Sequence, residues 1–186
     1  ARADWVVTSA IGLDIVREIA QGGVADGGDD GEPAEPVTIE TVTISCANDL
    51  ELEILHARGP TSGIHLVVQE GQRIPLWGSA IGTAFLTTLA DTTIRSMYRR
   101  SEHEPPVRRP VIALAAVLAM VRRARRYVYA RGASFLVPGV TAISARLPDR
   151  IGPRPLIVSI GGPSERVNAS RDAIAAALVA FIVDIQ

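Results

Sequence analysis

Two neighbouring segments of the chain alternate apolar and polar residues with a period of two, and this pattern limits the possible folds more than any other feature. Residues 37–45 read VTIETVTIS, and residues 50–59 read LELEILHARG. Such alternation indicates β-strands that bury one face. A third apolar segment spans residues 63–72, and the turn-forming pairs Asn48-Asp49 and Gly59-Pro60 separate the three segments. The sequence therefore predicts an antiparallel meander of three strands.

The remainder of the chain adds two strands and several helices. Strands are expected at residues 139–148 and 154–163. Helical periodicity is found in four segments, at residues 3–20, 91–100, 111–131 and 164–184. This order of elements is typical of an α+β fold, in which helices cover the faces of a central, mostly antiparallel sheet.

Size and composition indicate one domain over residues 1–186. The chain is 47% hydrophobic and 21% charged, and it is long enough to bury a core. Residues 22–36, which are rich in Gly, Asp, Glu and Pro, are expected to form a flexible loop. The acidic residues of this loop do not have the spacing of an EF-hand, so no calcium site is expected.

Bulk features narrow the class of protein. The formal net charge of −1 argues against a purely electrostatic hold on nucleic acid. A single cysteine, Cys46, excludes an internal disulfide and favours a reducing compartment, so a cytoplasmic location is expected. The run VIALAAVLAMV is too short to cross a bilayer, so no membrane association is expected. The chain starts with neither Met nor a signal segment, which suggests a fragment or a processed product.

Four arginines cluster near the end of the predicted helix 111–131. Arg122, Arg123, Arg125 and Arg126 would spread around much of the helix circumference rather than along one stripe. A solvated helix face and a contact with nucleic acid or a partner both remain open.

Catalytic patterns are not found. The chain has no lysine and therefore no phosphate-binding P-loop, and it contains neither G-x-S-x-G nor H-E-x-x-H. The histidines have no metal-ligand spacing with Cys46, so neither a metal nor a cofactor is expected. A non-enzyme is the expectation. The alternative is a small enzyme or stand-alone binding protein acting on an organic acid, for which His56 and His65 are the candidate bases.

The stretch GQRIPLWGSAIGTAFLTTL, residues 71–89, combines small residues with an apolar segment. A helix beginning near Ser79 would expose backbone N–H groups, and small side chains at Ala80 and Gly82 would let another molecule approach them. Leu76 and Trp77 would form an apolar wall beside this helix start. These features describe a pocket for a small organic acid. The alternative is that the small residues only allow the helix to pack on the sheet.

Three segments, GQRIPLWGSAIGTAFL, GVTAISARLPD and RPLIVSIGGP, follow one another between an opening helix and a closing Ala-rich helix. In this order they resemble motifs of the effector-binding domain of the IclR (isocitrate lyase regulator) family of bacterial transcription factors. The resemblance implies a GAF-like fold with a ligand pocket between the small-residue helix and two strands. The residues that it implies for the pocket are Ser79, Ala80, Ile81, Thr141, Ala142, Ser159 and Gly161.

The chain departs from the pattern of this family at several positions. Thr83 stands where the family usually has Lys, and residues 144–146 read SAR in place of the common Ala-Ala-Pro. Residues 133–138, ASFLVP, replace a longer acidic segment that often supplies a carboxylate to the ligand. These departures suggest a different or more apolar ligand.

The resemblance also implies a role. A small organic acid or aromatic effector would shift the arrangement of a homodimer or tetramer and thereby change DNA binding. DNA would be bound only by a winged helix-turn-helix outside this chain, and residues 1–21 would be the linker or dimerisation helix. The identity of the effector, the operator and the choice between repression and activation do not follow from the sequence.

Overall fold

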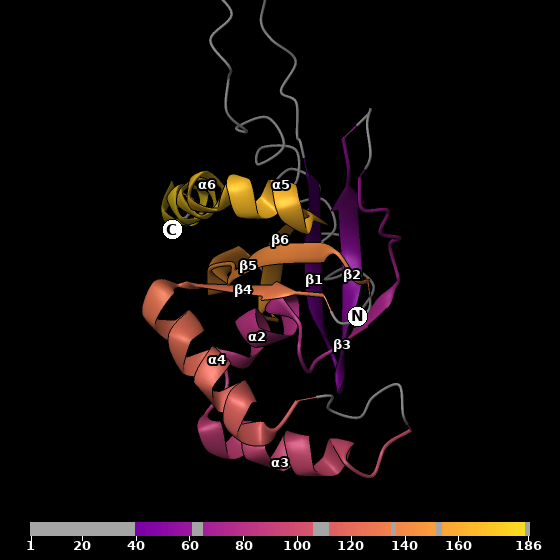
Figure 1. Ribbon diagram of the computed structural model, residues 1–186. Coiled ribbons are helices and arrows are strands. Elements are labelled where there is room, and N and C mark those ends of the chain that lie inside the picture. The colour runs from indigo at the N-terminus through magenta and orange to yellow at the C-terminus, as the bar shows by residue number, and fades with distance from the viewer. Residues whose placement is uncertain (1–39, 61–64, 106–111, 135–136, 152–153, 185–186) are drawn as a thin grey trace, which may run out of the picture.

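The computed structural model describes residues 40–60, 65–105, 112–134, 137–151 and 154–184. The predicted helix at 3–20 and the loop at 22–36 lie outside these ranges. In the described part, strands form one antiparallel sheet in the order β3-β2-β1-β6-β5-β4 (Figure 1). The strands are β1 (Thr41–Asn48), β2 (Glu51–Arg58), β3 (Arg73–Pro75), β4 (Tyr129–Ala133), β5 (Val140–Arg146) and β6 (Leu156–Pro163). The predicted antiparallel α+β architecture is confirmed.

Helices cover both faces of this sheet. They are α2 (Ala80–Leu86), α3 (Asp91–Ser101), α4 (Leu114–Tyr127), α5 (Ser164–Ala169) and α6 (Arg171–Asp184), with a 3₁₀ turn at Asp149–Ile151. Helices α2 and α4 lie on one face, α3 packs beyond them, and α5 and α6 lie on the opposite face (Figure 1). The molecule is therefore a three-layer structure with a core on each side of the sheet.

Side chains of the central strand β1 point alternately to the two sides of the sheet. Val42, Ile44 and Cys46 belong to the cluster beneath α6, together with residues such as Leu178. Their neighbours Thr41 and Thr43 are also buried, but they face the α2 side. Because adjacent side chains of a strand point to opposite faces, the alternation of Thr with Val and Ile gives β1 one apolar face and one hydroxyl-bearing face.

The cluster on the α2 side supplies most of the buried aromatic surface. Leu52, Leu76 and Ile94 are fully buried there, and the Trp77 ring packs edge-on against Tyr98 with centroids 5.3 Å apart. Burying one such apolar side chain contributes about 1.5–3 kcal/mol. This cluster fixes α2, α3 and α4 relative to the sheet.

Three predicted elements differ from those observed. The third strand of the meander is the short β3, and not residues 63–72. Helix α4 ends at Tyr127 because Val128 adopts a left-handed conformation (φ 67°), and the next residues form β4, which pairs with β5. The single helix predicted for 164–184 is divided at Ser170 into α5 and α6.

Candidate functional site

A cavity of about 110 Å³ lies between the sheet and the start of α2. Residues from all six strands, from the loops after β2 and β4, and from the start of α2 surround it. Its lining residues are Thr41, Thr43, Ile54, Leu66, Val67, Val68, Gln72, Ile74, Ser79, Ala80, Ile81, Gly132, Ser134, Val137, Val140, Ala142, Ser159 and Gly161.

The floor of the cavity consists of small and hydroxyl-bearing residues that lie in register across the sheet. Thr41 of β1 is paired with Gly161 of β6, which is paired in turn with Ala142 of β5. In the next row, Thr43 is paired with Ser159. Larger side chains at these positions would fill the space beneath α2, so the cavity follows directly from the sequence of the three central strands.

Helix α2 forms the roof, and Ser79 fixes where it begins. Ser79 is the N-cap residue, and its Oγ accepts a hydrogen bond from the Gly82 N–H at 2.9 Å. The Thr83 hydroxyl donates to the Ser79 carbonyl at 2.8 Å and tightens the same turn. This capping holds Ala80 over the floor of the cavity.

Gly82 serves packing rather than ligand access. A Cβ atom at this position would lie 1.8 Å from the carbonyl oxygen of Leu76. The backbone of α2 therefore approaches the preceding turn too closely for any side chain. Gly82 thus packs against the turn before the helix, whereas the alternative stated for these small residues was packing on the sheet.

Residues 65–72, predicted as a strand, leave the ladder and close one side of the cavity. The Thr41 hydroxyl donates to the Leu66 carbonyl at 2.5 Å, and Gly71 (φ 79°) turns the chain back toward β2. The mouth is apolar, since Val67 is 72% exposed and Val137 is 43% exposed.

The structure brings six of the nine predicted site residues together around this cavity: Ser79, Ala80, Ile81, Ala142, Ser159 and Gly161. Leu76 and Trp77 do not form its wall, because both are buried in the core of the α2 side. Thr141 faces the other side of the sheet, where its hydroxyl lies 2.8 Å from that of Ser164.

Sequence reasoning missed the contributions of β1 and of the loop after β2. Thr41 and Thr43 carry a signal in the sequence, since they alternate with apolar residues on a strand predicted to be central. Leu66, Val67 and Val68 carry no such signal, because their role depends on the departure of this loop from the sheet.

The polar side chains of the lining are hydroxyls and the Gln72 amide, whose Oε1 accepts a hydrogen bond from the Gln69 N–H at 3.2 Å. Thr43 is 4% exposed, and its Oγ1 has no hydrogen-bond partner among the described residues. The Ser159 hydroxyl donates to that of Ser144 at 2.7 Å. No lining residue carries a side chain that ionises.

A larger hollow of about 580 Å³ runs along the outer edge of β4 and is lined by the polar side chains of several elements. Arg131 donates to Asn168 at 2.6 Å, and Arg171 pairs with Asp172 at 2.8 Å. The lining of this hollow is largely charged and polar, whereas that of the smaller cavity is mostly apolar, so the smaller cavity better suits a small apolar molecule.

The candidate bases and the cysteine lie outside the cavity. His56 Nδ1 lies 3.2 Å from Glu70 Oε1, and neither His56 nor His65 lines the cavity. Burial raises the pKa of the Cys46 thiol, which keeps it in the less reactive protonated form. Among the described residues, no group of His, Cys, Asp and Glu side chains is arranged to hold a metal ion.

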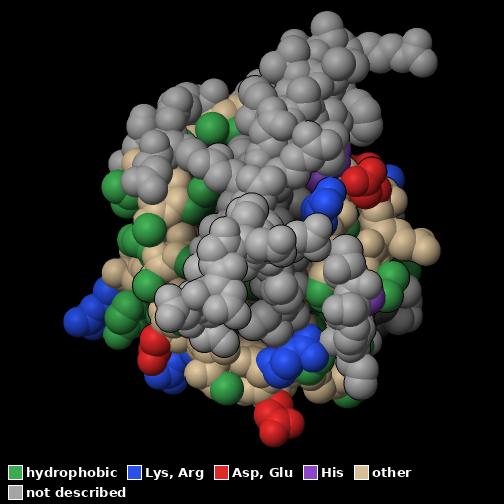
Figure 2. Space-filling model, turned by 90° about the horizontal axis from the view of Figure 1, so that it is seen from above, with side chains coloured by type: hydrophobic (Ala, Val, Ile, Leu, Met, Phe, Trp, Pro, Cys, Tyr) green, Lys and Arg blue, Asp and Glu red, His purple; other side chains and the backbone are tan. Residues whose placement is uncertain are grey.

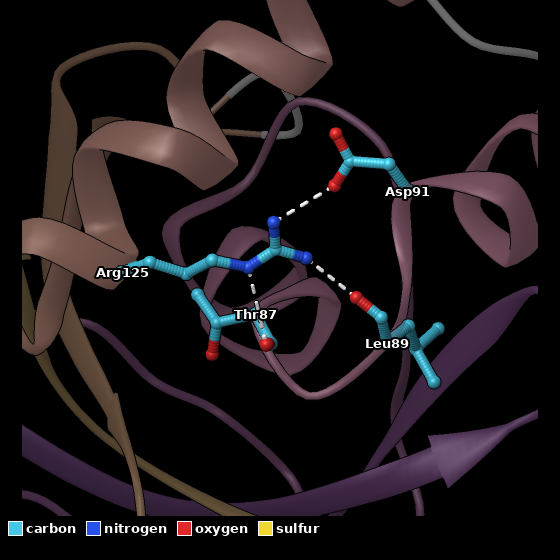
Figure 3. A network of polar contacts seen from close by, with 4 residues as sticks. All are labelled: Thr87, Leu89, Asp91 and Arg125. Carbon is cyan, nitrogen blue, oxygen red and sulfur yellow. Dashed lines mark hydrogen bonds and ion pairs between the residues drawn. The ribbon is translucent and has the colours of Figure 1, made fainter.

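The basic and acidic side chains of described residues that are visible in Figure 2 lie in small separate groups. One of the clustered arginines has a structural role. The Arg125 guanidinium donates to the carbonyls of Thr87 and Leu89 and pairs with Asp91 at 2.8 Å (Figure 3). In the described part of the chain, no helix is both long and apolar enough to cross a membrane.

Comparisons with known proteins agree with this architecture. The family model for the C-terminal domain of the bacterial transcriptional regulator IclR matches residues 36–185. The HTH-type transcriptional repressor AllR of Escherichia coli K12 is 25% identical over 132 residues, which cover 71% of this chain and 49% of AllR. The chain thus spans about half the length of the curated relatives that it matches.

Solved structures show the same fold. The effector domain of the putative regulator IclR from Acinetobacter sp. ADP1 superposes with a TM-score of 0.75 at 22% identity, over 96% of this chain and 95% of that domain. The C-terminal domain of E. coli KdgR gives a TM-score of 0.69 at 19% identity, with 98% and 96% covered. The predicted GAF-like fold is confirmed, and the chain belongs to the IclR family of bacterial transcriptional regulators, of which it matches the C-terminal domain.

Proposed function

We propose that this chain is the ligand-sensing domain of a cytoplasmic transcription factor and that its effector occupies the cavity between α2 and the sheet. The observation that carries the proposal is the convergence of three separate segments, one from α2, one from β5 and one from β6, on a single cavity. These are the segments that the family resemblance marks as pocket-forming. The site residues proposed are Ser79, Ala80, Ile81, Ala142, Ser159 and Gly161, together with Thr41 and Thr43.

The regulatory mechanism is a shift of population between arrangements of a homodimer or homotetramer. A ligand shifts such an equilibrium only if it binds the two states with different affinity. Here it would contact the first turn of α2 on one side and the sheet on the other. The loop that follows α2 is tied by Arg125 to α4, so a displacement of α2 would be passed to α4.

DNA would be bound outside this chain. The matched relatives carry the name of HTH-type repressors, and this chain covers about half of their length. By analogy, the effector would change the affinity or spacing of a helix-turn-helix module connected through residues 1–21. No residue described around the cavity supplies a general base, so the proposal involves binding without turnover.

A thermal-shift screen of organic acids and neutral aromatic compounds tests the proposal. We expect at least one compound to stabilise the chain, because binding to the native state alone raises its unfolding temperature. In Ala142→Leu, a larger side chain on the floor of the cavity should abolish that shift. Ala133→Leu is the matched control, since Ala133 is exposed on the neighbouring edge strand and does not line the cavity.

The two variants make the result decisive. A shift that survives in Ala142→Leu would place the binding site elsewhere. A broad screen without any specific shift would contradict the sensor role and leave α2 with a packing function only.

A further inference from the structure

The lining of the cavity is uncharged, although the chain as a whole is 21% charged. None of the residues around the cavity is Asp, Glu, Arg or His. Residues 59–64 and 133–142 also contain no ionisable residue, whereas His65, Arg73 and Arg131 directly adjoin lining residues in the sequence. An ionised ligand would therefore meet no opposite charge among the described lining residues.

Of the ionisable residues next to lining residues in the sequence, Glu40, Arg73 and Arg131 are bonded to groups outside the lining. Glu40 immediately precedes β1, and its carboxylate binds the Arg166 guanidinium, with Oε1 and Nε 2.9 Å apart. The His56 ring contacts Glu70. Burial of a carboxylate without a cation or a full set of hydrogen bonds is strongly disfavoured.

Helix α2 does not replace the missing cation. It has only seven residues, and the Gly82 N–H is bonded to Ser79 Oγ while the Thr83 N–H is bonded to the Ser79 carbonyl. The partial positive charge at a helix start is smaller than one elementary charge. Here, two of the N–H groups that contribute to it are already hydrogen-bonded. The carboxylate-binding role predicted for the N–H groups of Ser79, Ala80 and Ile81 stays a prediction, whereas those of Gly82 and Thr83 are already bonded within the turn.

One polar feature of the floor points to a specific contact. Thr43 is 4% exposed, it lines the cavity, and its Oγ1 has no hydrogen-bond partner among the described residues. Buried hydroxyls are nearly always hydrogen-bonded, so an orphan hydroxyl on a cavity wall calls for a partner within the cavity. The adjacent Ser159 hydroxyl donates to Ser144, which leaves its lone pairs to accept.

We infer that the effector is an uncharged, largely apolar molecule of about one ring, with a single hydroxyl, carbonyl or amide group that hydrogen-bonds to Thr43. This inference rests on the proposed function. The cavity of about 110 Å³ is smaller than a dry apolar cavity of about 150 Å³ that binds benzene, so one ring is the upper limit of size. The exposed Val67 and Val137 provide an apolar entrance that suits such a compound.

Two pairs of probes of matched shape test the inference on the full chain at pH 7. Benzamide and benzoate differ in charge, and phenol and toluene differ in one hydroxyl. Dissociation constants would be measured by ligand-observed NMR or calorimetry. We expect benzamide to bind at least tenfold more tightly than benzoate, and phenol to bind more tightly than toluene.

Thr43→Val isolates the contact because valine keeps the shape and removes the hydroxyl. The variant should weaken phenol binding about five- to tenfold, as expected for the loss of one hydrogen bond, and should change toluene binding less than twofold. Its unfolding temperature without ligand should not fall, because no hydrogen bond within the protein is lost. Thr141→Val, on the opposite face of the sheet, should leave the binding of all four probes unchanged.

The outcomes distinguish a failure of this inference about the effector from a failure of the proposed sensor function. Tighter binding of benzoate, abolished by Ala142→Leu, would overturn the uncharged class while the sensor proposal stands. Equal losses for phenol and toluene in Thr43→Val would overturn the role of Thr43. If none of the four probes binds, the inferred class of single-ring effectors is wrong. The thermal-shift screen with wild type and Ala142→Leu then tests the sensor proposal independently.

Discussion

At the scale of single residues, Gly82 shows how closely α2 is packed. A methyl group there would lie 1.8 Å from the Leu76 carbonyl oxygen, which belongs to the backbone and cannot rotate away. We expect Gly82→Ala to lower the free energy of unfolding by about 2–3 kcal/mol, even though alanine favours helices. Urea denaturation would measure the loss.

Gly132→Ala is the control for Gly82→Ala, since its Cβ would meet the Ala80 nitrogen at an ordinary 3.7 Å. This variant should change stability by less than about 1 kcal/mol. Similar losses in the two variants would show that α2 can move away from the preceding turn, and the packing interpretation of Gly82 would then fail.

The same scale explains which site residues the sequence could predict. Ser159 and Gly161 lie two positions apart on a strand, so both face the cavity, and the same holds for Thr41 and Thr43. Thr141 and Ala142 are adjacent, so only one of them could do so. The family resemblance implied that both residues line the pocket, whereas the period of two in a strand lets only one of them face it.

At the scale of elements, Arg125 joins α4 to the loop between α2 and α3. Its guanidinium donates to the carbonyls of Thr87 and Leu89 and pairs with Asp91, which is in the first turn of α3. Since these carbonyls follow the end of α2, Arg125→Met should lower the free energy of unfolding by about 1–2 kcal/mol. The site is half-exposed, so the ion pair contributes little of this.

Arg126→Met tests whether the loss at Arg125 comes from those hydrogen bonds. Arg126 is exposed on the same helix, and the structure gives it no polar contact with a described residue. Thermal denaturation should leave this control within about 0.5 kcal/mol of the wild type. An equal effect of both substitutions would assign the stabilisation to helix propensity or net charge.

The elements that the sequence predicted poorly are those set by tertiary context. The arginine-rich helical pattern continues to Arg131, but the left-handed Val128 ends α4, and the following residues gain partners only because β5 lies beside them. Residues 65–72 have the composition of a strand, yet they leave the sheet to cover the cavity. Strands with strong alternation, such as β1 and β2, were predictable because burial and period agree there.

At the scale of the whole molecule, the arrangement of charge bears on DNA binding. The formal net charge is −1, and several arginines are engaged within the fold, among them Arg125 with Asp91 and Arg166 with Glu40. Affinity for duplex DNA depends largely on cations that are available to phosphates.

We therefore expect this chain alone to bind duplex DNA only weakly at physiological salt, with no preference among sequences. A gel-shift or fluorescence-anisotropy titration would measure this, and added salt should remove the residual binding because it is electrostatic. Arg122 and Arg126 are exposed on α4 and are the residues to replace in a test of this binding. Sub-micromolar, sequence-dependent binding would contradict the proposal that DNA is bound outside this chain. If replacing both arginines by Met abolished that binding, α4 would be the element that contacts DNA.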